Sequence, residues 1–549
     1  MAIAPVKKLA KAAAVPFDRE ARVSLALSFI IGALVGLVVV AFILLTGRLS
    51  ARMYPVDSPA WRRVLTPVIG AAFSGYLLYR FFPDARGSGI PQAKFALFIN
   101  DGYISLRTVC GKFLCCSISL ASGIALGREG PSVQIGAGIA SDLGRRFGLS
   151  KANLRAVLPM GCAAALAAAF NTPIAAVLFS LEEIMGDLHA PVLGSVVISS
   201  ATSWMVLHLI LGDQALFHVP AYHLVDPREF LIYAALGIAG GLGSVVFVKL
   251  LLYLRLLFRK LPRATVWVQP AIGGLVVGLM ALYRPEVMGV GYDYVERVLG
   301  GDLALQTVTM LIVLKIIATA TCYSSGNAGG IFGPALFIGA MIGGALGSVA
   351  HHMFPAITAG PGAYALVGMG AAFAGIIRTP LTSVLMIFEL TRDYTIIVPV
   401  MIANLISFAI SYRLQRQPIY EALAHQEGVS LPGLREIGEG GFSVSDVARP
   451  VGETDETAAL EAMRDAGVRT WPVVQDGHLR FMVDAAGIPA EAGDVMYPDQ
   501  SLSAAIEKMG AAKVDALPVM SRATAGKVIG VVTMPDVLAA FGVTEGHPA

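Results

Sequence analysis

Residues 112–137, KFLCCSISLASGIALGREGPSVQIGA, recur 203 positions later as residues 315–340, KIIATATCYSSGNAGGIFGPALFIGA, with ten identities in 26 positions. A second match, at an offset of 207, aligns residues 161–182 with residues 368–389. One ancestral unit of roughly 200 residues therefore occurs twice in this chain. The fold is expected to be a double repeat.

The composition is that of a membrane protein. Of the 549 residues, 56% are hydrophobic and 14% are charged, whereas a soluble chain carries charge on about a quarter of its residues. Apolar runs such as residues 25–45 and 230–252 are long enough to span a hydrocarbon core of about 30 Å. Other runs are broken by Gly or Pro, which is tolerated at membrane depth only beside protein or a water-filled cavity. We therefore predict a mainly α-helical membrane protein with a transport pathway where the repeats meet.

The sequence divides into four parts. Residues 1–22 are expected to be a cytoplasmic segment, because five basic residues precede the first apolar run and no signal-peptide cleavage site follows it. The transmembrane domain is expected at residues 23–421, with repeat 1 at about 23–212 and repeat 2 at about 228–412. A linker at residues 422–440 leads to a soluble domain at residues 441–549.

Charge is distributed unevenly between these parts. From residue 435 to the end there are 17 acidic and 9 basic side chains, a net charge of −8. Since the whole chain has a net charge of +3, the part before residue 435 has a net charge of +11. A basic membrane region favours anions by focusing the electric field. Contacts with lipid headgroups account for most of these charges equally well.

Three Gly/Pro-rich stretches abut apolar helical runs: residues 87–91 (GSGIP), 127–131 (GREGP) and 329–334 (GGIFGP). Gly permits backbone conformations that aim amides inward, and Pro suits the first turn of a helix. Each stretch is expected to begin a helix inside the membrane, where unpaired amides and the positive end of the helix dipole bind an anion. A site without a full positive charge suits a conducted ion, which must bind and also leave.

The two copies differ at informative positions. The first copy carries a polar or ionisable side chain where the second is apolar in three aligned pairs: Ser88 and Val290, Glu129 and Phe332, Glu183 and Leu390. A structural role would usually be shared by both copies, so we interpret the three polar residues as functional candidates. An ionisable residue at membrane depth makes function the default hypothesis.

These motifs closely resemble those of the CLC family of chloride channels and chloride/proton exchangers. GSGIP, GREGP, GGIFGP, the pair Glu182-Glu183 and the sequence Pro418-Ile419-Tyr420 occur in the family's order across nearly the whole chain. The resemblance implies a CLC-type double inverted repeat of tilted and broken helices, a pore in each subunit and a homodimer. It also implies an integral protein of the bacterial inner membrane, with both termini in the cytoplasm, that exchanges chloride for protons.

The resemblance assigns roles to the two candidate glutamates. Glu129 matches the gating glutamate: a carboxylate at an anion-binding helix terminus can occupy the chloride site, and its protonation lets chloride replace it. Glu183 matches the internal proton-transfer glutamate, which many channels of the family replace by an apolar residue. The plainer interpretations are a first-turn Glu that stabilises a helix dipole by less than about 1 kcal/mol for Glu129, and a solvated helix end for Glu183.

The resemblance also assigns ligands to a central anion: the hydroxyls of Ser88 and Tyr420, and the amides of Gly130, Ile331 and Phe332. Serine at position 88 favours chloride, because family members with Pro there tend to prefer nitrate and those with Met prefer fluoride. The alternative interpretations are a helix N-cap for Ser88 and an interfacial aromatic anchor for Tyr420.

Ionisable residues that recur in both halves receive different interpretations. Glu182 and Glu389 are assigned to structure or to solvated helix ends. Lys112 and Lys315 either set the local field or snorkel to a membrane surface.

Other function classes remain as alternatives. A passive chloride channel of the same fold is the main one, followed by a fluoride- or nitrate-selective exchanger. The sequence shows no Ser/His/Asp set typical of an enzyme, no metal-ligand spacing, and none of the clustered carboxylates that cation sites need. We expect neither an enzyme nor a nucleic-acid partner, and chloride, protons and the lipid bilayer as the partners.

The C-terminal region contains a shorter repeat at an offset of 46, with Pro472-Val473 matching Pro518-Val519. It resembles a tandem pair of CBS modules, which often bind adenine nucleotides, although the first copy is atypical. Thr533 and Asp536 stand where such modules hold phosphate and ribose, so an adenine nucleotide is the one cofactor that the resemblance suggests. The same Thr-x-x-Asp spacing is also a capping box, and a packed regulatory or dimer-stabilising role is therefore the simpler expectation.

Overall fold

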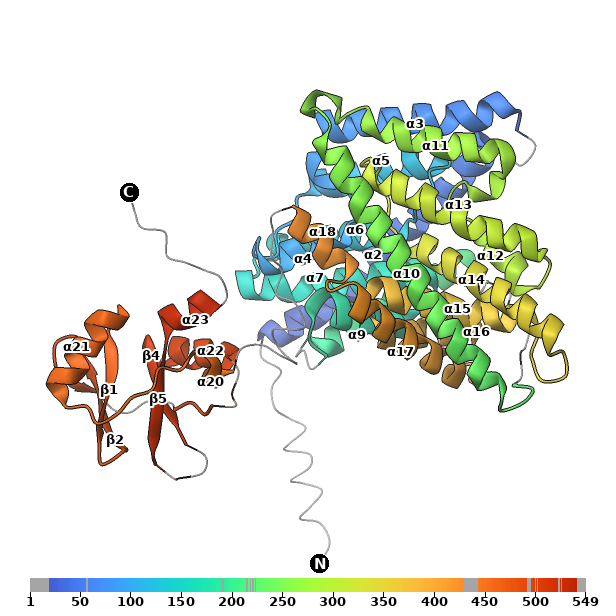
Figure 1. Ribbon diagram of the computed structural model, residues 1–549. Helices are drawn as coiled ribbons and strands as arrows, with labels where there is room; N and C mark the ends of the chain where they lie inside the picture. Colours follow the sequence, from blue (N-terminus) through green and yellow to red (C-terminus); the bar gives the residue numbers. More distant parts are fainter. Residues whose placement is uncertain are drawn as a thin grey trace, which may run out of the picture. The chain divides into compact units, whose positions relative to one another are not determined.

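The computed structural model describes residues 19–427 and 443–540, apart from short gaps at residues 56–57, 189–191, 214–215, 218, 220–221, 223, 491–494, 499, 501, 522–523 and 525. The chain folds into two compact units, residues 1–431 and 432–549. The first unit is helical, and the second combines short helices with strands (Figure 1).

Each repeat of the first unit supplies a matching series of helices. The first series is α2 (Arg19–Met53), α3 (Ala60–Arg80), η1 (Pro83–Ala85), α4 (Ile90–Phe98), α5 (Leu106–Ala121), α6 (Glu129–Arg146), α7 (Lys151–Phe170), α8 (Pro173–Phe179), η2 (Ser180–Met185) and α9 (Leu193–Leu211). The second is α10 (Glu229–Lys260), η3 (Arg263–Thr265), α11 (Gln269–Tyr283), η4 (Pro285–Val287), α12 (Tyr292–Leu299), α13 (Leu305–Ser324), α14 (Phe332–Met353), α15 (Pro361–Ile377), α16 (Pro380–Thr391) and α17 (Ile397–Leu414). The helix α18 (Ile419–Gln426) follows.

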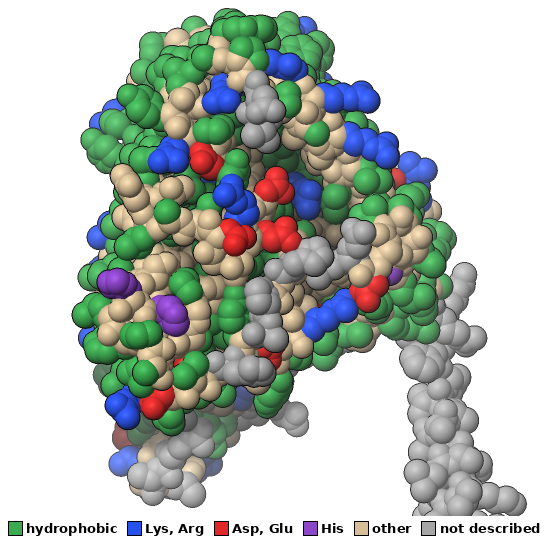
Figure 2. All heavy atoms as spheres, turned by 90° about the vertical axis from the view of Figure 1, so that its right-hand side faces the viewer, with side chains coloured by type: hydrophobic (Ala, Val, Ile, Leu, Met, Phe, Trp, Pro, Cys, Tyr) green, Lys and Arg blue, Asp and Glu red, His purple; other side chains and the backbone are tan. Residues whose placement is uncertain are grey.

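Among the described residues, seven helices are long and apolar enough to cross a membrane, which confirms the predicted membrane class. Three helices begin at the residues that sequence analysis expected to start helices: α4 after Gly89, α6 at Glu129 and α14 at Phe332. In the face shown in Figure 2, hydrophobic side chains cover much of the flanks. Such a surface is favourable against lipid.

Small residues let the helices of each repeat approach closely. Gly136 of α6 faces Gly161 of α7, and a Cβ added to either would overlap the carbonyl oxygen of the other. Gly339 of α14 and Gly368 of α15 repeat this contact in the second copy. Close backbone approach at small residues is the usual way in which membrane helices pack, because lipid provides little hydrophobic drive for their association.

The two repeats contact each other in an antiparallel arrangement. In Figure 1, α3 and α11 lie side by side, and Gly274 of α11 packs on Pro67 of α3 while Gly278 packs on Val64. Because α3 and α11 are equivalent in the two copies, the same helix of each repeat binds its counterpart. The predicted double repeat is therefore a repeat of structure as well as of sequence.

The helix α18 extends further than the predicted domain boundary. Residues 422–426, which sequence analysis placed at the start of the linker, form its last turns. Ala422, Leu423 and Ala424 are buried, and Arg255 of α10 donates to the carbonyl of Leu423 at 3.0 Å. These contacts hold the segment on the membrane unit.

The second unit contains two helix-and-hairpin copies. The first comprises α21 (Glu456–Ala466), β1 (Thr470–Gln475) and β2 (His478–Asp484); the second comprises α22 (Leu502–Ala512), β4 (Ala516–Met520) and β5 (Val528–Thr533). Both hairpins are antiparallel. The remaining elements are α20 (Val444–Val447), β3 (Pro489–Ala490) and α23 (Met534–Ala540).

The two copies of the soluble unit end differently. In the second copy β5 leads directly into the helix α23, whereas in the first copy β2 pairs with the short strand β3. Both copies form a second strand, β2 in the first copy and β5 in the second. Within the described residues, the helix that should follow is absent, which agrees with its atypical sequence.

Candidate functional site

The helices α6 and α14 begin beside each other. The N–H of Gly127 donates to the carbonyl of Gly330 at 2.7 Å, and the N–H of Gly330 donates to the carbonyl of Gly127 at 2.7 Å. These glycines are equivalent at the offset of 203. The reciprocal pair therefore brings the N-terminal ends of two equivalent helices to one place.

Glu129 lies at this junction. It is the first residue of α6, and its side chain is fully buried. Its Oε1 accepts a hydrogen bond from the hydroxyl of Tyr292, while Oε2 has no hydrogen-bond partner among the described residues. Oε2 faces α14, since a Cβ added to Gly333 would lie 3.4 Å from it. Oε2 therefore lies where the amides of a helix N-terminus would bind an anion.

Ser88 lies next to the start of α6. It is fully buried, and its Oγ accepts from the N–H of Ile90 at 3.4 Å, a long bond of the capping type. Its carbonyl oxygen would lie 2.7 Å from a Cβ added to Gly130. The start of α4, the start of α6 and the start of α14 thus converge, as the sequence predicted.

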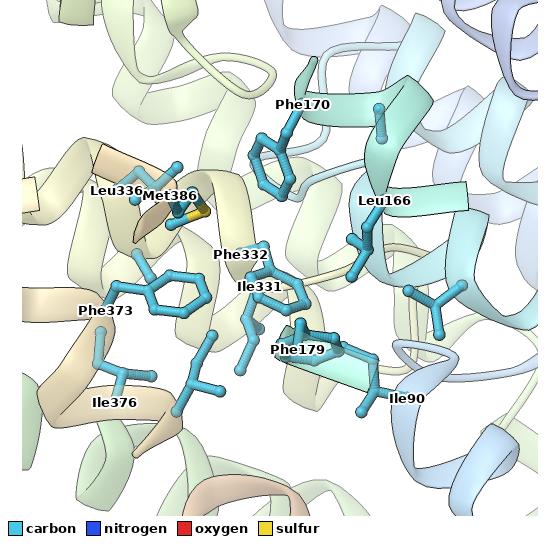
Figure 3. Close-up of a cluster of buried hydrophobic side chains, with 14 of the residues drawn as sticks. Ile90, Leu166, Phe170, Phe179, Ile331, Phe332, Leu336, Phe373, Ile376 and Met386 are labelled. Atoms are coloured by element: carbon cyan, nitrogen blue, oxygen red, sulfur yellow. The ribbon is translucent and has the colours of Figure 1, made fainter. Parts of the chain in front are cut away.

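Ile331 and Phe332 begin α14 inside an apolar cluster. Figure 3 shows Phe332 between Phe373, Phe170 and Phe179, with Ile331 beside it. The ring centroids of Phe332 and Phe373 lie 5.1 Å apart. The cluster excludes water around the amides of these residues, and a hydrogen bond is electrostatically stronger in such surroundings.

Tyr420 of α18 meets this cluster. Its ring centroid lies 6.4 Å from that of Phe332, and its hydroxyl is buried without a hydrogen-bond partner among the described residues. A buried hydroxyl without a partner is costly unless something else binds it. Tyr420 is fully buried, which does not fit the alternative interpretation as an interfacial aromatic anchor.

Glu183 is buried beside a lysine that sequence analysis did not single out. Lys94 of α4 donates from Nζ to Glu183 Oε1 at 2.9 Å, and both side chains are about 7% exposed. A solvated helix end is therefore excluded for Glu183. The residue lies in η2, a π-helical turn that continues α8, and such turns are frequent at functional sites. The sequence signal that could have identified Lys94 is that it is the one charged residue in the apolar helix 90–98.

Glu182 and Glu389 cap helices of the opposite repeat. The carboxylate of Glu389 accepts from the N–H groups of Ile174 and Ala175 at 2.9 and 2.7 Å, at the start of α8. The carboxylate of Glu182 accepts from the N–H of Thr382 at 2.8 Å, at the start of α16. Their role is structural, as expected from their recurrence, but they are not solvated ends.

Lys112 and Lys315 are fully buried and do not snorkel. Lys112 Nζ donates to the carbonyls of Ala85 and Gly87 at 2.8 and 2.7 Å. Lys315 Nζ donates to the carbonyls of Val287 and Gly289 at 3.1 and 2.7 Å. Each lysine therefore fixes the glycine loop that precedes α4 or α12.

A cavity of about 1010 Å³ opens beside the Ser88 loop. Its lining includes Gly87 and Tyr323, and Tyr323 also lies next to Ser88. Five arginines line it, against two acidic side chains, Asp84 and Glu427; the arginines are Arg86, Arg107, Arg255, Arg259 and Arg263. An excess of positive charge around a cavity concentrates anions at its base.

The predicted nucleotide residues of the soluble unit bind each other. The Thr533 hydroxyl donates to Asp536 Oδ2 at 2.6 Å, and the Asp536 N–H donates to Thr533 Oγ1 at 3.3 Å. Arg449 donates to both oxygens of Asp536 at 2.7 and 2.6 Å. The geometry is that of the capping alternative.

Comparisons with known proteins agree with this geometry. Residues 70–412 match the family described as voltage gated chloride channel, and residues 495–542 match the CBS domain. The H(+)/Cl(-) exchange transporter ClcA of Vibrio campbellii is 34% identical over 375 residues, which cover 67% of this chain and 80% of the relative. Its namesake in Vibrio cholerae is 34% identical over 379 residues, with the same coverage.

A solved structure is similar as well. The crystal structure of a slow cyanobacterial Cl-/H+ antiporter matches with a TM-score of 0.68 and 26% identity, covering 74% of this chain and 97% of that one. The family match, the relatives and the converging helix ends all point to one conclusion. This chain belongs to the voltage gated chloride channel family, the CLC family that its sequence motifs resemble.

Proposed function

We propose that this chain exchanges chloride for protons across the membrane, with Glu129 as the gating and coupling residue. The placement of Glu129 supports this most: it is a buried carboxylate between two helix N-termini, with one oxygen unpaired among the described residues. Ionised, it occupies the place that an anion would take. Protonated, it loses the charge that holds it there and makes way for chloride, so the carboxylate and a chloride ion alternate at one position.

We assign the central chloride to the hydroxyls of Ser88 and Tyr420 and the amides of Gly130, Ile331 and Phe332. The hydroxyl of Tyr420, unpaired within the described part of the chain, supports this assignment, because it needs an acceptor. None of these donors carries a charge, so chloride can bind and also leave. Serine at position 88 favours chloride over nitrate or fluoride.

We assign the inner proton relay to Glu183. It is buried and forms an ion pair with Lys94. A proton relay separate from the anion path is what distinguishes an exchanger from a passive channel of the same fold. The relatives named as exchange transporters favour the exchanger.

The test uses purified protein in liposomes, with chloride and proton fluxes measured together. The wild type should move protons uphill when chloride flows down its gradient. Glu129→Gln should pass chloride but move no protons, and Glu183→Gln should lose proton flux with chloride flux retained. A reversal potential that ignores a pH gradient would identify a passive channel instead.

We further propose a homodimer in the bacterial inner membrane with both termini cytoplasmic. Exposed apolar side chains on α9 and α17 support contact with lipid or a second copy, among them Met205, Leu209, Met401 and Leu405. Cross-linking in native membranes tests the dimer. For the soluble unit, adenine-nucleotide binding at Thr533 and Asp536 stays a proposal, tested by the thermal shift of the full chain with ATP and its loss in Asp536→Ala.

A further inference from the structure

Tyr292 is the one described side chain that hydrogen-bonds the carboxylate of Glu129, and sequence analysis did not single it out. It is the first residue of α12, and its hydroxyl donates to Glu129 Oε1. Gly291 before it has φ = 87°, a conformation that glycine adopts without strain, and Lys315 binds the carbonyl of Gly289. The loop that aims the phenol at Glu129 is thus fixed from both sides.

The two repeats differ at this position. Tyr292 follows Gly289-Val290-Gly291 as Ile90 follows Gly87-Ser88-Gly89, at an offset of 202. Ile90 is buried in the apolar cluster of Figure 3 and has no side-chain polar atom. The second copy therefore carries a donor where the first does not, and that donor reaches the glutamate that only the first copy has. The same comparison of halves that identified Glu129 would have found it.

Neighbouring side chains pack against the ring of Tyr292, and its hydroxyl contacts the carboxylate of Glu129. The ring of Tyr292 contacts Phe217 edge-on, with centroids 5.4 Å apart, and the Arg128 guanidinium lies 5.6 Å from its centre. Among the described residues, the charged and polar groups near Glu129 come from four helices. They are Arg128 of α6, whose Nε lies 4.0 Å from Oε1, Tyr292 of α12, Tyr420 of α18 and the amides at the start of α14. Asp293, the next residue, is exposed.

We propose that Tyr292 is a positioning residue that holds Glu129 in the blocking position and thereby sets the pH at which the gate is released. A phenol that donates to a carboxylate makes a charge-assisted bond, which favours the ionised form. Protonation of Glu129 weakens that bond and frees the side chain to leave. This inference rests on the proposed gating function of Glu129.

The experiment compares Tyr292→Phe with the wild type in liposomes between pH 4 and pH 8. Tyr292→Phe keeps the ring contacts and removes only the donor. The pH at which the exchange rate is half-maximal should rise by about one unit. This corresponds to the tenfold change in the protonation equilibrium expected when a hydrogen bond to a charged group is lost. The ratio of chloride to protons should stay unchanged. Tyr292→Ile, which installs the residue of the first repeat, should move the midpoint in the same direction.

Two controls make the outcome specific. Tyr294→Phe removes a phenol from the same helix without touching Glu129, and it should keep the wild-type profile. In the Glu129→Gln background, adding Tyr292→Phe should change neither the chloride flux nor its pH dependence, because the carboxylate is already gone.

An unchanged midpoint in Tyr292→Phe would overturn the inference, as would an equal effect in the Glu129→Gln background. If the wild type moves chloride without protons, the exchange proposal fails while the role of Tyr292 is still tested. In that case chloride flux through Tyr292→Phe should begin at a higher pH than flux through the wild type. The same pH dependence in both proteins would refute the role of Tyr292.

Discussion

Gly127 and Gly330 occupy equivalent positions in the two repeats and bind each other through two reciprocal hydrogen bonds of 2.7 Å. Residue i of one copy binds residue i of the other in both directions, which is the signature of a local two-fold relation. The two glycines lie just before the starts of α6 and α14. Glu129 follows two residues later, so the symmetric junction carries an asymmetric carboxylate.

Replacing Gly127 should damage the gate. A Cβ at this position would overlap Glu129 Oε2 and lie 3.1 Å from the N–H nitrogen of Gly333. We expect Gly127→Ala to lower the free energy of unfolding by about 1–3 kcal/mol and to displace the carboxylate, so that chloride flux rises relative to proton flux. Thermal unfolding in detergent and liposome flux measure the two effects. Gly47→Ala is the control, because nothing lies within 4 Å of its Cβ; equal behaviour of the two variants contradicts the prediction.

Removing Lys94 alone should lower the free energy of unfolding more than removing both Lys94 and Glu183. Lys94→Leu leaves a buried carboxylate without its counter-charge, which typically costs about 3–5 kcal/mol, as when any buried pair is broken. Replacing both residues by Leu should restore most of that stability. Proton flux should fall in the single and double variants, with chloride flux retained. A Lys94→Leu protein as stable as the wild type and with normal proton flux would rule this out.

The buried lysines should prove structural. Lys112→Met removes two hydrogen bonds from a charged donor to loop carbonyls, each worth about 1.5 kcal/mol, so the loss of stability should be about 3 kcal/mol. Lys315→Met should behave alike. Lys249→Met, at an exposed position of α10, is the matched control and should change little. If the lysines only snorkelled, all three variants would have the same melting temperature.

The soluble unit should be less stable in acid through Asp536. Its burial would by itself raise the pKa, but hydrogen bonds from Arg449 and Thr533 and the charge of Arg449 outweigh it, so the pKa of Asp536 lies below its ordinary value. A lowered pKa stabilises the fold above the unfolded value of about 3.9, and this contribution is lost as the pH falls toward the folded pKa.

Asp536→Asn should therefore lower the stability of the soluble unit at pH 7 by about 1 kcal/mol, a small figure because Arg449 is 43% exposed. Calorimetry of the full chain should show the difference between variant and wild type shrinking below about pH 4. A difference that stays constant from pH 7 to pH 3 would mean that the ion pair contributes nothing.

Much of the architecture could be predicted from the sequence, because its evidence is local or periodic. Long apolar runs predicted the spans, and Gly/Pro stretches predicted where α4, α6 and α14 begin. Comparison of the two halves selected Ser88, Glu129 and Glu183, since a residue that differs between copies of one fold is not required by that fold. These inferences do not depend on knowing which distant segments pack against each helix.

What each polar group binds was decided by the tertiary structure. Lys94 meets Glu183 across 89 residues and Tyr292 meets Glu129 across 163, and no local pattern encodes such distances. Sequence alone left Lys112 and Lys315 between setting the local field and snorkelling to a membrane surface. It left Glu182 between a structural role and a solvated helix end. It could not decide because burial is a property of the packed helices. In a membrane interior a polar group must find a partner, and only the packing of distant segments determines which partner it finds.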